Sequence, residues 1–137
     1  MTTAQIAIED AILEQLQPLT DMGITVRKLP DKPNQSGTVA ENGIITLSPV
    51  TSIQSLGTSA DRSVQPVLQS VTLDGRVKKF RSNGSVLRIQ PELQRLLGGF
   101  RPPKGGALRF QKFEMKARDD VYWIFQAEYR FPMLLGT

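Results

Sequence analysis

Residues 121–131, VYWIFQAEYRF, decide the fold class of this chain. Alternate positions are apolar or aromatic: Val121, Trp123, Phe125, Ala127, Tyr129 and Phe131. A period of two is typical of a strand with one buried face. Residues 108–115 alternate in the same way until the register changes, which indicates a β-bulge near Lys112. With a turn at residues 117–120 between them, the two stretches predict a long antiparallel ribbon with one buried side.

Two helices are expected upstream of this ribbon. In residues 6–16, Ile8, Ile12 and Leu16 recur at helical spacing, which predicts an amphipathic helix. Residues 91–97 predict a short second helix, with Pro91 at its first position and glycines directly after it. Residues 86–89, before that helix, suit either a strand or an irregular lead-in.

Three further stretches have strand character. They cover residues 24–29, 39–47 and 67–73. The Asp74-Gly75 pair that follows is a turn signal, and it predicts either a hairpin or a bend in one long strand. Residues 48–63 are rich in Ser, Thr, Gln, Gly and Pro, which favours a polar loop.

These elements predict a single domain over residues 1–137, of the α+β class. We expect an antiparallel or mixed β-sheet of four to five strands, with an N-terminal helix and a second short helix packed on it. The length of 137 residues suits one core, and 39% of the residues are hydrophobic.

The composition excludes several kinds of chemistry. The chain has no Cys and no His, which removes disulfides, thiol nucleophiles, Ser-His-Asp triads and the usual zinc sites. No apolar run is long enough to span a membrane, and residues 1–5 lack the features of a secretory signal. We therefore expect a soluble protein that binds no metal or cofactor and has no membrane partner.

The carboxylates do not form a recognisable catalytic group. Asp119 and Asp120 are adjacent in an expected turn, where both side chains meet water. Glu9, Asp10 and Glu14 are expected to be solvated on the surface of the first helix. No glycine-rich loop has the phosphate-binding pattern. An enzymatic function is the weak interpretation, and a hydrolase would need carboxylates that only folding brings together.

A basic segment offers a surface for phosphates. It contains Arg76, Lys78, Lys79, Arg81 and Arg88, with Phe80 among them. Such a pattern can follow a phosphate backbone and stack a base. A strand would send alternate side chains to opposite faces, however, and the net charge of +4 is small for a dedicated binder. A strand end that faces solvent or another subunit is therefore favoured over specific nucleic-acid recognition.

Residues 98–106, GGFRPPKGG, form the most unusual stretch. The prolines fix the backbone and the flanking glycines permit bends, so a rigid segment carries one aromatic residue and two cations. The stretch suits equally a helix-to-strand connection with Phe100 in the core and a contact loop.

Around this loop the sequence resembles the tail terminator family of Mu-like contractile-tailed bacteriophages. The resemblance rests on GITVRKLPD at 23–31, GIITL at 43–47 and LLGGFRPP at 96–103, followed by a Trp-bearing strand. It implies a small α+β protein that forms a hexameric ring at the head-proximal end of the tail tube, ends tube growth and joins the tail to the neck. The implied partners are further copies of the chain, the tail tube protein, the tail sheath protein and the neck or connector protein. Genomic DNA would pass through the lumen without sequence-specific binding. The implied location is the tail-neck junction of the virion, after assembly in the host cytoplasm.

Such a ring needs two different adhesive surfaces on each copy. The candidate subunit or tube contacts are Phe100, Arg101, Pro102, Pro103, Lys104, Phe131, Met133, Leu134 and Leu135. The residues 133–135 are equally suited to folding back on their own domain. The candidate lumen residues are Arg76, Lys78, Lys79 and Arg81. The alternative function is a small nucleic-acid-binding module that uses the basic segment 76–88.

Overall fold

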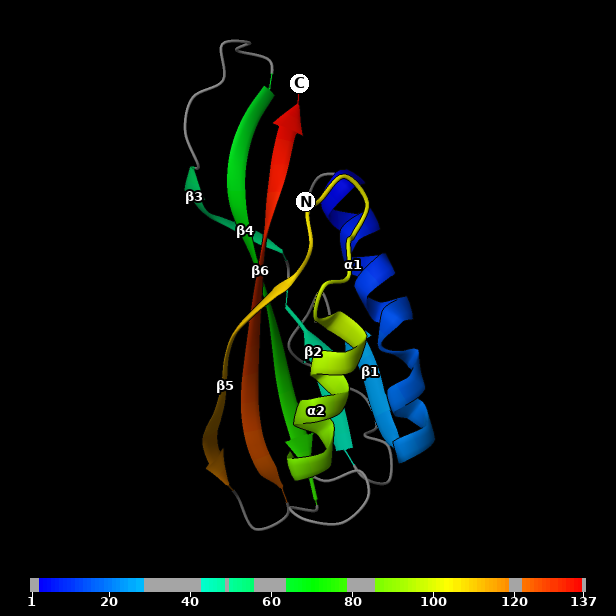
Figure 1. Cartoon of the computed structure of the whole chain (residues 1–137). Helices are drawn as coiled ribbons and strands as arrows, with labels where there is room; N and C mark the ends of the chain where they lie inside the picture. Colours follow the sequence, from blue (N-terminus) through cyan, green and yellow to red (C-terminus); the bar gives the residue numbers. More distant parts are fainter. Residues whose placement is uncertain are drawn as a thin grey trace.

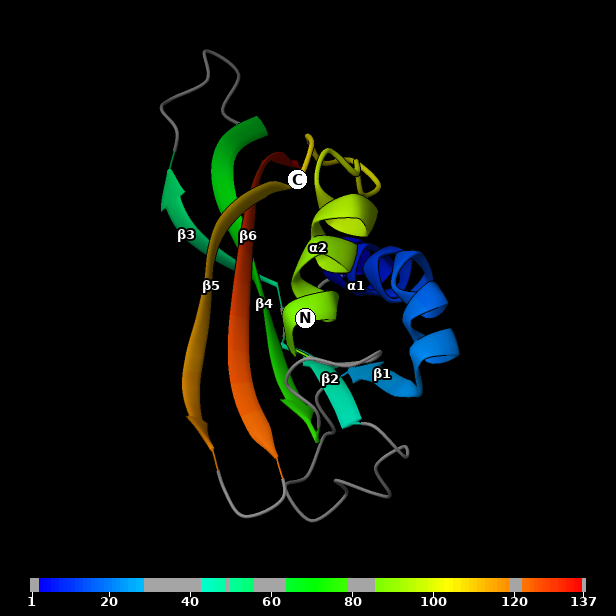
Figure 2. The ribbon, with the colours of Figure 1, turned by 60° about the horizontal axis from the view of Figure 1, so that its bottom comes forward.

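The computed structural model describes residues 3–28, 43–48, 50–55, 64–78, 86–118 and 122–136. Along the chain the elements are α1 (Thr3–Gln15), the 3-10 helix η1 (Gln17–Met22), β1 (Ile24–Lys28), β2 (Gly43–Leu47), β3 (Thr51–Ser55), β4 (Val64–Val77), α2 (Val86–Leu97), β5 (Arg109–Arg118) and β6 (Trp123–Gly136). Both α-helices lie on one face of a twisted sheet (Figure 1, Figure 2). The predicted α+β class is confirmed.

The sheet is mixed, with strand order β1-β2-β4-β6-β5. Only β1 and β2 run parallel, and the other neighbours are antiparallel. The two longest strands, β4 and β6, pair over their whole length from Val64↔Gly136 to Val77↔Trp123. Their paired ends, together with β3, continue past the helices at one end of the molecule (Figure 1).

Strand β3 lies within the stretch that the composition predicted as a polar loop. The prediction of a loop over 48–63 is wrong at residues 51–55, which pair with Val67–Ser70 of β4. Strand β2 pairs with Leu73–Val77 of β4, so β2 and β3 follow one another along the same edge. The backbone supplies the pairing of β3, and this explains why its side chains gave no apolar pattern.

Strand β4 continues through the predicted turn signal at Asp74-Gly75. The hairpin alternative is wrong and the alternative of one long strand is confirmed, because β4 extends without a break from Val64 to Val77. The strand predicted for residues 39–47 begins at Gly43, and residues 39–42 lie outside the described part of the chain.

Helix α1 covers the sheet with Ile8, Ile12 and Leu16, which are completely buried as their spacing predicted. The expectation that Glu9 is solvated is wrong, since this residue is only 2% exposed. Its Oε2 accepts a hydrogen bond from the amide of Val50 at 3.4 Å, while the Gln5 side chain donates to the Val50 carbonyl at 3.1 Å. Two side chains of one helix thus hold the connection between β2 and β3 against the helical layer.

Helix α2 begins five residues before the predicted start, at Val86, and Pro91 lies inside it. The prediction of a strand or lead-in over 86–89 is therefore wrong. The buried residues of the helix are Val86, Ile89, Leu93, Leu96 and Leu97. Their apolar spacing extends across Pro91, and burial of this face offsets the backbone hydrogen bond that proline cannot donate. Gly99 ends the helix region with φ of 81°, as the glycine pair predicted.

Strands β5 and β6 form the predicted antiparallel ribbon. The register shifts between Phe110 and Lys112, which confirms the predicted bulge, and shifts again between Met115 and Ala117. From Phe125 to Met133, alternate side chains of β6 are at most 4% exposed. The two faces of β6 thus differ, since its helix-facing side is core and its opposite side is mostly polar. On β5 the paired residues Phe110 and Met115 are 39% and 42% exposed.

Candidate functional site

The sheet face opposite the helices is open and mostly polar, and we call it the outer face. On its three central neighbouring strands, the side chains at alternate positions include Leu68, Ser70, Thr72, Asp74 and Arg76 on β4, Ile124, Gln126, Glu128, Arg130 and Pro132 on β6, and Arg109, Lys112 and Glu114 on β5. The register aligns them in rows across the sheet. The cations Arg76, Arg109, Lys112 and Arg130 outnumber the acids Asp74, Glu114 and Glu128 in this set.

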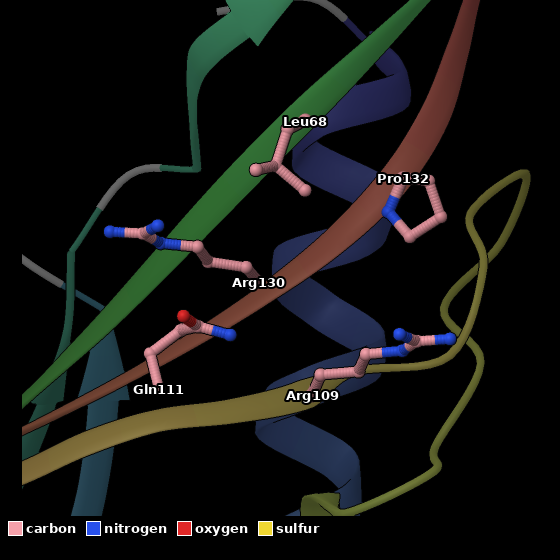
Figure 3. A pocket seen from close by; sticks show the side chains of 5 residues that line it. All are labelled: Leu68, Arg109, Gln111, Arg130 and Pro132. Carbon is pink, nitrogen blue, oxygen red and sulfur yellow. The ribbon is translucent and has the colours of Figure 1, made fainter. Parts of the chain in front are cut away.

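A hollow of about 340 Å³ lies on this face, lined by Leu68, Arg109, Gln111, Arg130 and Pro132. Leu68 and Pro132 are paired neighbours on β4 and β6, and Arg109 is paired with Arg130. The bulge after Phe110 places Gln111 beside them. Figure 3 shows the two guanidinium groups extending in different directions from the hollow. The hollow therefore combines an apolar part with two separated positive charges.

Arg130 has an acidic partner, and among the described residues Arg109 has none. Arg130 Nε donates to Glu128 Oε2 at 2.9 Å, and the hydroxyl of Ser70 donates to the same oxygen at 2.8 Å. The hydrogen bond from Arg130 is the largest effect that lowers the pKa of Glu128 from its ordinary value, and the bond from Ser70 adds to it. Arg109 is exposed and makes no ion pair with any residue that the structure describes.

The Glu128 network predicts a measurable acid sensitivity. A carboxyl with a lowered folded pKa stabilises the fold above its unfolded pKa, and this stabilisation is lost as the pH falls through the folded pKa. Glu128→Gln should therefore lower the free energy of unfolding at pH 7 by about 1 kcal/mol or less, because the pair is partly exposed. Urea unfolding between about pH 5 and pH 3 should show a flatter pH dependence than in the parent.

Ser70→Ala provides the matched comparison, since it removes one of the two hydrogen bonds to Glu128. Its acid dependence should lie between those of the parent and Glu128→Gln. Equal slopes in all three proteins would contradict the assigned role of this network.

The loop of residues 98–106 is tied to the domain by backbone hydrogen bonds. The amide of Gly99 donates to the Leu108 carbonyl at 3.0 Å, and the amide of Leu108 donates to the Phe100 carbonyl at 2.8 Å. The amide of Gly106 donates to the Pro132 carbonyl at 2.8 Å, so the loop also covers part of the β6 edge. Lys104 has a left-handed φ of 62° at the exposed tip. The loop is thus a fixed rim beside the hollow.

The structure divides the predicted contact residues of this loop into two groups. Phe100 packs against the core and Pro102 is buried, which favours the connection over the contact loop at these two positions. Arg101, Pro103 and Lys104 are exposed and stay available for contact. The interface prediction for these residues stays a prediction, and the exposed tip is the part of the loop that a partner can reach.

Two of the predicted C-terminal contact residues are buried in the domain. Phe131 is completely buried and Met133 is only 4% exposed in the single chain, so both side chains belong to the core of the domain, and their predicted role in an interface stays a prediction. Both side chains belong to the inner face of β6, the same face as Phe125 and Tyr129. The backbones of Leu134 and Leu135 pair with Pro66 and Gln65, and their side chains lie outside the described part of the structure.

The predicted basic segment is described only in part. Arg76 and Lys78 are exposed at the end of β4, and Arg88 is exposed on α2. Lys79, Phe80 and Arg81 lie outside the described residues, as do Asp119 and Asp120. Sequence reasoning missed Arg109 and Arg130, although the alternation of the ribbon already separated them from the core positions.

Two general findings concern other kinds of site. Within the described ranges, no three His, Cys, Asp or Glu side chains gather closely enough to hold a metal ion. None of the described helices is long and apolar enough to cross a bilayer.

Comparisons with known proteins give structural likenesses alone. No family model matches the sequence, and no curated protein matches it. A chain from the virion of a native gene transfer agent particle has a similar structure, with a TM-score of 0.63 and 11% identity over 100% of both chains. A second solved structure, whose name says nothing of its function, has a TM-score of 0.60 and 12% identity over 96% of each chain. At these identities the likeness shows a shared fold.

Proposed function

We propose that this chain is a structural protein of a phage-like virion. The observation that carries the proposal is the structural match with a chain of the gene transfer agent virion, which covers both chains from end to end. A match of this kind concerns the whole domain, since it covers 100% of each chain. It supports a common architectural use more directly than a match confined to one motif would.

Within the virion, we propose the role of a tail terminator. Six copies form a ring that caps the head-proximal end of the tail tube and sheath and joins the tail to the neck or connector. The resemblance around residues 96–103 supports this finer assignment, and the exposed tip at Arg101, Pro103 and Lys104 is a contact surface on the rim of the domain. The proposed function is not enzymatic, and DNA passes through the ring without sequence-specific contact.

Labelling of purified particles tests this role. Immunogold electron microscopy with an antibody against the chain should place gold at the tail-neck junction of particles from cells that carry the gene. Deletion of the gene should give tails of uncontrolled length or tails detached from heads. Particles that lack the chain, or gold distributed along the tail, would contradict the proposal.

A further inference from the structure

The outer face combines paired arginines with apolar surface, and this composition favours the binding of a partner. Arg109 and Arg130 occupy directly paired positions on neighbouring strands, an arrangement that is destabilising for like charges. Glu128 offsets the charge of Arg130, and Arg109 remains exposed. In the neighbouring row of the sheet, Leu68 and Pro132 contribute apolar surface to the hollow (Figure 3). A complementary surface would bring a carboxylate to the arginines and an apolar side chain to the hollow.

The solvent side of α1 has this composition. Ile6, Asp10 and Glu14 follow one another at intervals of four residues and are all exposed, so they form one stripe along the helix. Ile6 is 40% exposed, so the stripe presents a large apolar side chain next to its two acids. Residues 1–26 contain four acids and no Lys or Arg. Asp10 forms an ion pair with Lys28, whereas Glu14 has none with any residue in the described ranges.

The two surfaces lie on opposite sides of the molecule. The helices cover the inner face of the sheet, and in Figure 3 α1 lies behind the strands that carry the hollow. One copy therefore cannot satisfy its own hollow with its own α1. A contact between unlike surfaces of identical copies is heterologous, and it produces a closed ring or an open filament.

We infer that the outer face around Arg109 and Arg130 is the docking surface for α1 of the next copy. The stripe of Ile6, Asp10 and Glu14 lies against the hollow, with Ile6 near Leu68 and Pro132 and with Glu14 near the arginines. This inference rests on the proposed ring and names the contact that builds it. Charge complementarity across the contact also orients the copies, because two outer faces repel each other.

Charge exchange between the two surfaces tests the contact. Arg109→Glu and Glu14→Lys should each weaken association at least about tenfold, the effect of about 1.4 kcal/mol, while the two changes combined in one chain should restore it. Arg88→Glu, which changes an exposed cation on α2 by the same charge, is the control and should associate like the parent. Analytical ultracentrifugation over a range of concentrations provides the measurement. Failure of the combined variant to recover would overturn the inference.

Cross-linking distinguishes this contact from the ring itself. The chain has no Cys, so Gln17→Cys and Gln111→Cys can be introduced together and joined by a short bis-maleimide. Both positions are exposed, and the two changes leave Glu14 and Arg109 in place. A covalent series that ends at six copies supports both the contact and the ring. A series that continues beyond six supports the contact and contradicts the ring, whereas hexamers without cross-links contradict the contact alone. An absence of both hexamers and cross-links contradicts both.

Nucleic acid is the competing occupant of a basic sheet face. A fluorescent double-stranded oligonucleotide separates the two cases. If Arg109→Glu abolishes oligonucleotide binding and leaves cross-linking between Gln17→Cys and Gln111→Cys unchanged, the face serves nucleic acid and the inference is overturned. Under the inference, cross-linking is lost in this variant and oligonucleotide binding is weak in the parent.

Discussion

Phe131→Ala should lower the free energy of unfolding by about 3 to 5 kcal/mol, the usual range for removing a buried aromatic ring. Phe131 is completely buried on the inner face of β6. Its ring also supports the loop of residues 98–106, because a β-carbon placed on Gly105 would lie 2.9 Å from Phe131 Cδ2 and 3.0 Å from Pro102 Cγ. The substitution therefore leaves a cavity beneath the loop as well as within the core. Urea unfolding followed by fluorescence of Trp123 measures the loss.

Pro132→Ala is the matched control, since Pro132 is the exposed neighbour on the other face of the same strand. Its effect on stability should stay within about 0.5 kcal/mol, as for most surface substitutions. A Phe131→Ala protein that has the stability of the parent and a specific defect in association would contradict the core role and support an interface role for Phe131. Truncation after Phe131 is not an equivalent test, because it removes strand residues that pair with Val64–Leu68.

Strand β6 shows how well a period of two in the sequence predicts which side chains are buried. The alternation from Trp123 to Phe131 predicted the buried face of β6, and the structure confirms it. Met133 occupies the next position of the same pattern and is buried as well. The apolar composition of residues 131–135 favours a contact surface. The alternation of the strand, however, separates the inner positions Phe131 and Met133 from the outer position Pro132.

Strand β3 is an element that the sequence does not predict. Thr51–Ser55 has the composition of a loop, and its place in the sheet comes from the edge that β4 offers after β2 ends. A long strand leaves unpaired backbone groups along its edge, and pairing them favours a strand even for polar residues. Such a gain depends on tertiary structure and has no local pattern.

The predicted start of helix α2 is wrong for a different reason. Pro91 is a standard signal for a helix start, so the sequence predicts a start at that residue. Val86 and Ile89 nevertheless have helical spacing with Leu93, and the helix begins at Val86. The apolar period of a helix was present on both sides of the proline. Since Pro91 lies on the exposed side, its ring avoids the packed face, and the helix continues through it.

The outer-face site could be predicted only in part. Alternation places Glu128 and Arg130 opposite the core, so their exposure on one face follows from the sequence. The pairing of Arg109 with Arg130 depends on the turn after β5 and on two register shifts, which shift every pairing beyond them. The burial of Glu9 similarly depends on the amide of Val50, which is 41 residues away.

Gly75→Ala should be the second large destabilisation, near the upper end of the range of about 1 to 3 kcal/mol for overpacking. Gly75 lies within β4, and a β-carbon there would overlap the ring of Phe125. The φ of Gly75 is not in the left-handed region, so alanine suits the backbone and the loss comes from the ring. Phe125 is completely buried, and Phe113 stacks on it with ring centroids 4.8 Å apart. The glycine that resembled a turn signal thus makes room for an aromatic side chain of the neighbouring strand.

A double-mutant cycle tests whether contact with the ring of Phe125 causes the destabilisation by Gly75→Ala. Phe125→Leu removes part of the ring and leaves a cavity, which destabilises the parent, whereas in the Gly75→Ala background the new methyl group occupies part of that space. The two substitutions together should therefore cost less than the sum of their separate effects, with a coupling of about 1 to 2 kcal/mol. Urea unfolding of all four proteins gives the coupling energy. Strictly additive effects would show that Gly75 is required for the backbone of β4, and that the ring of Phe125 is not the cause.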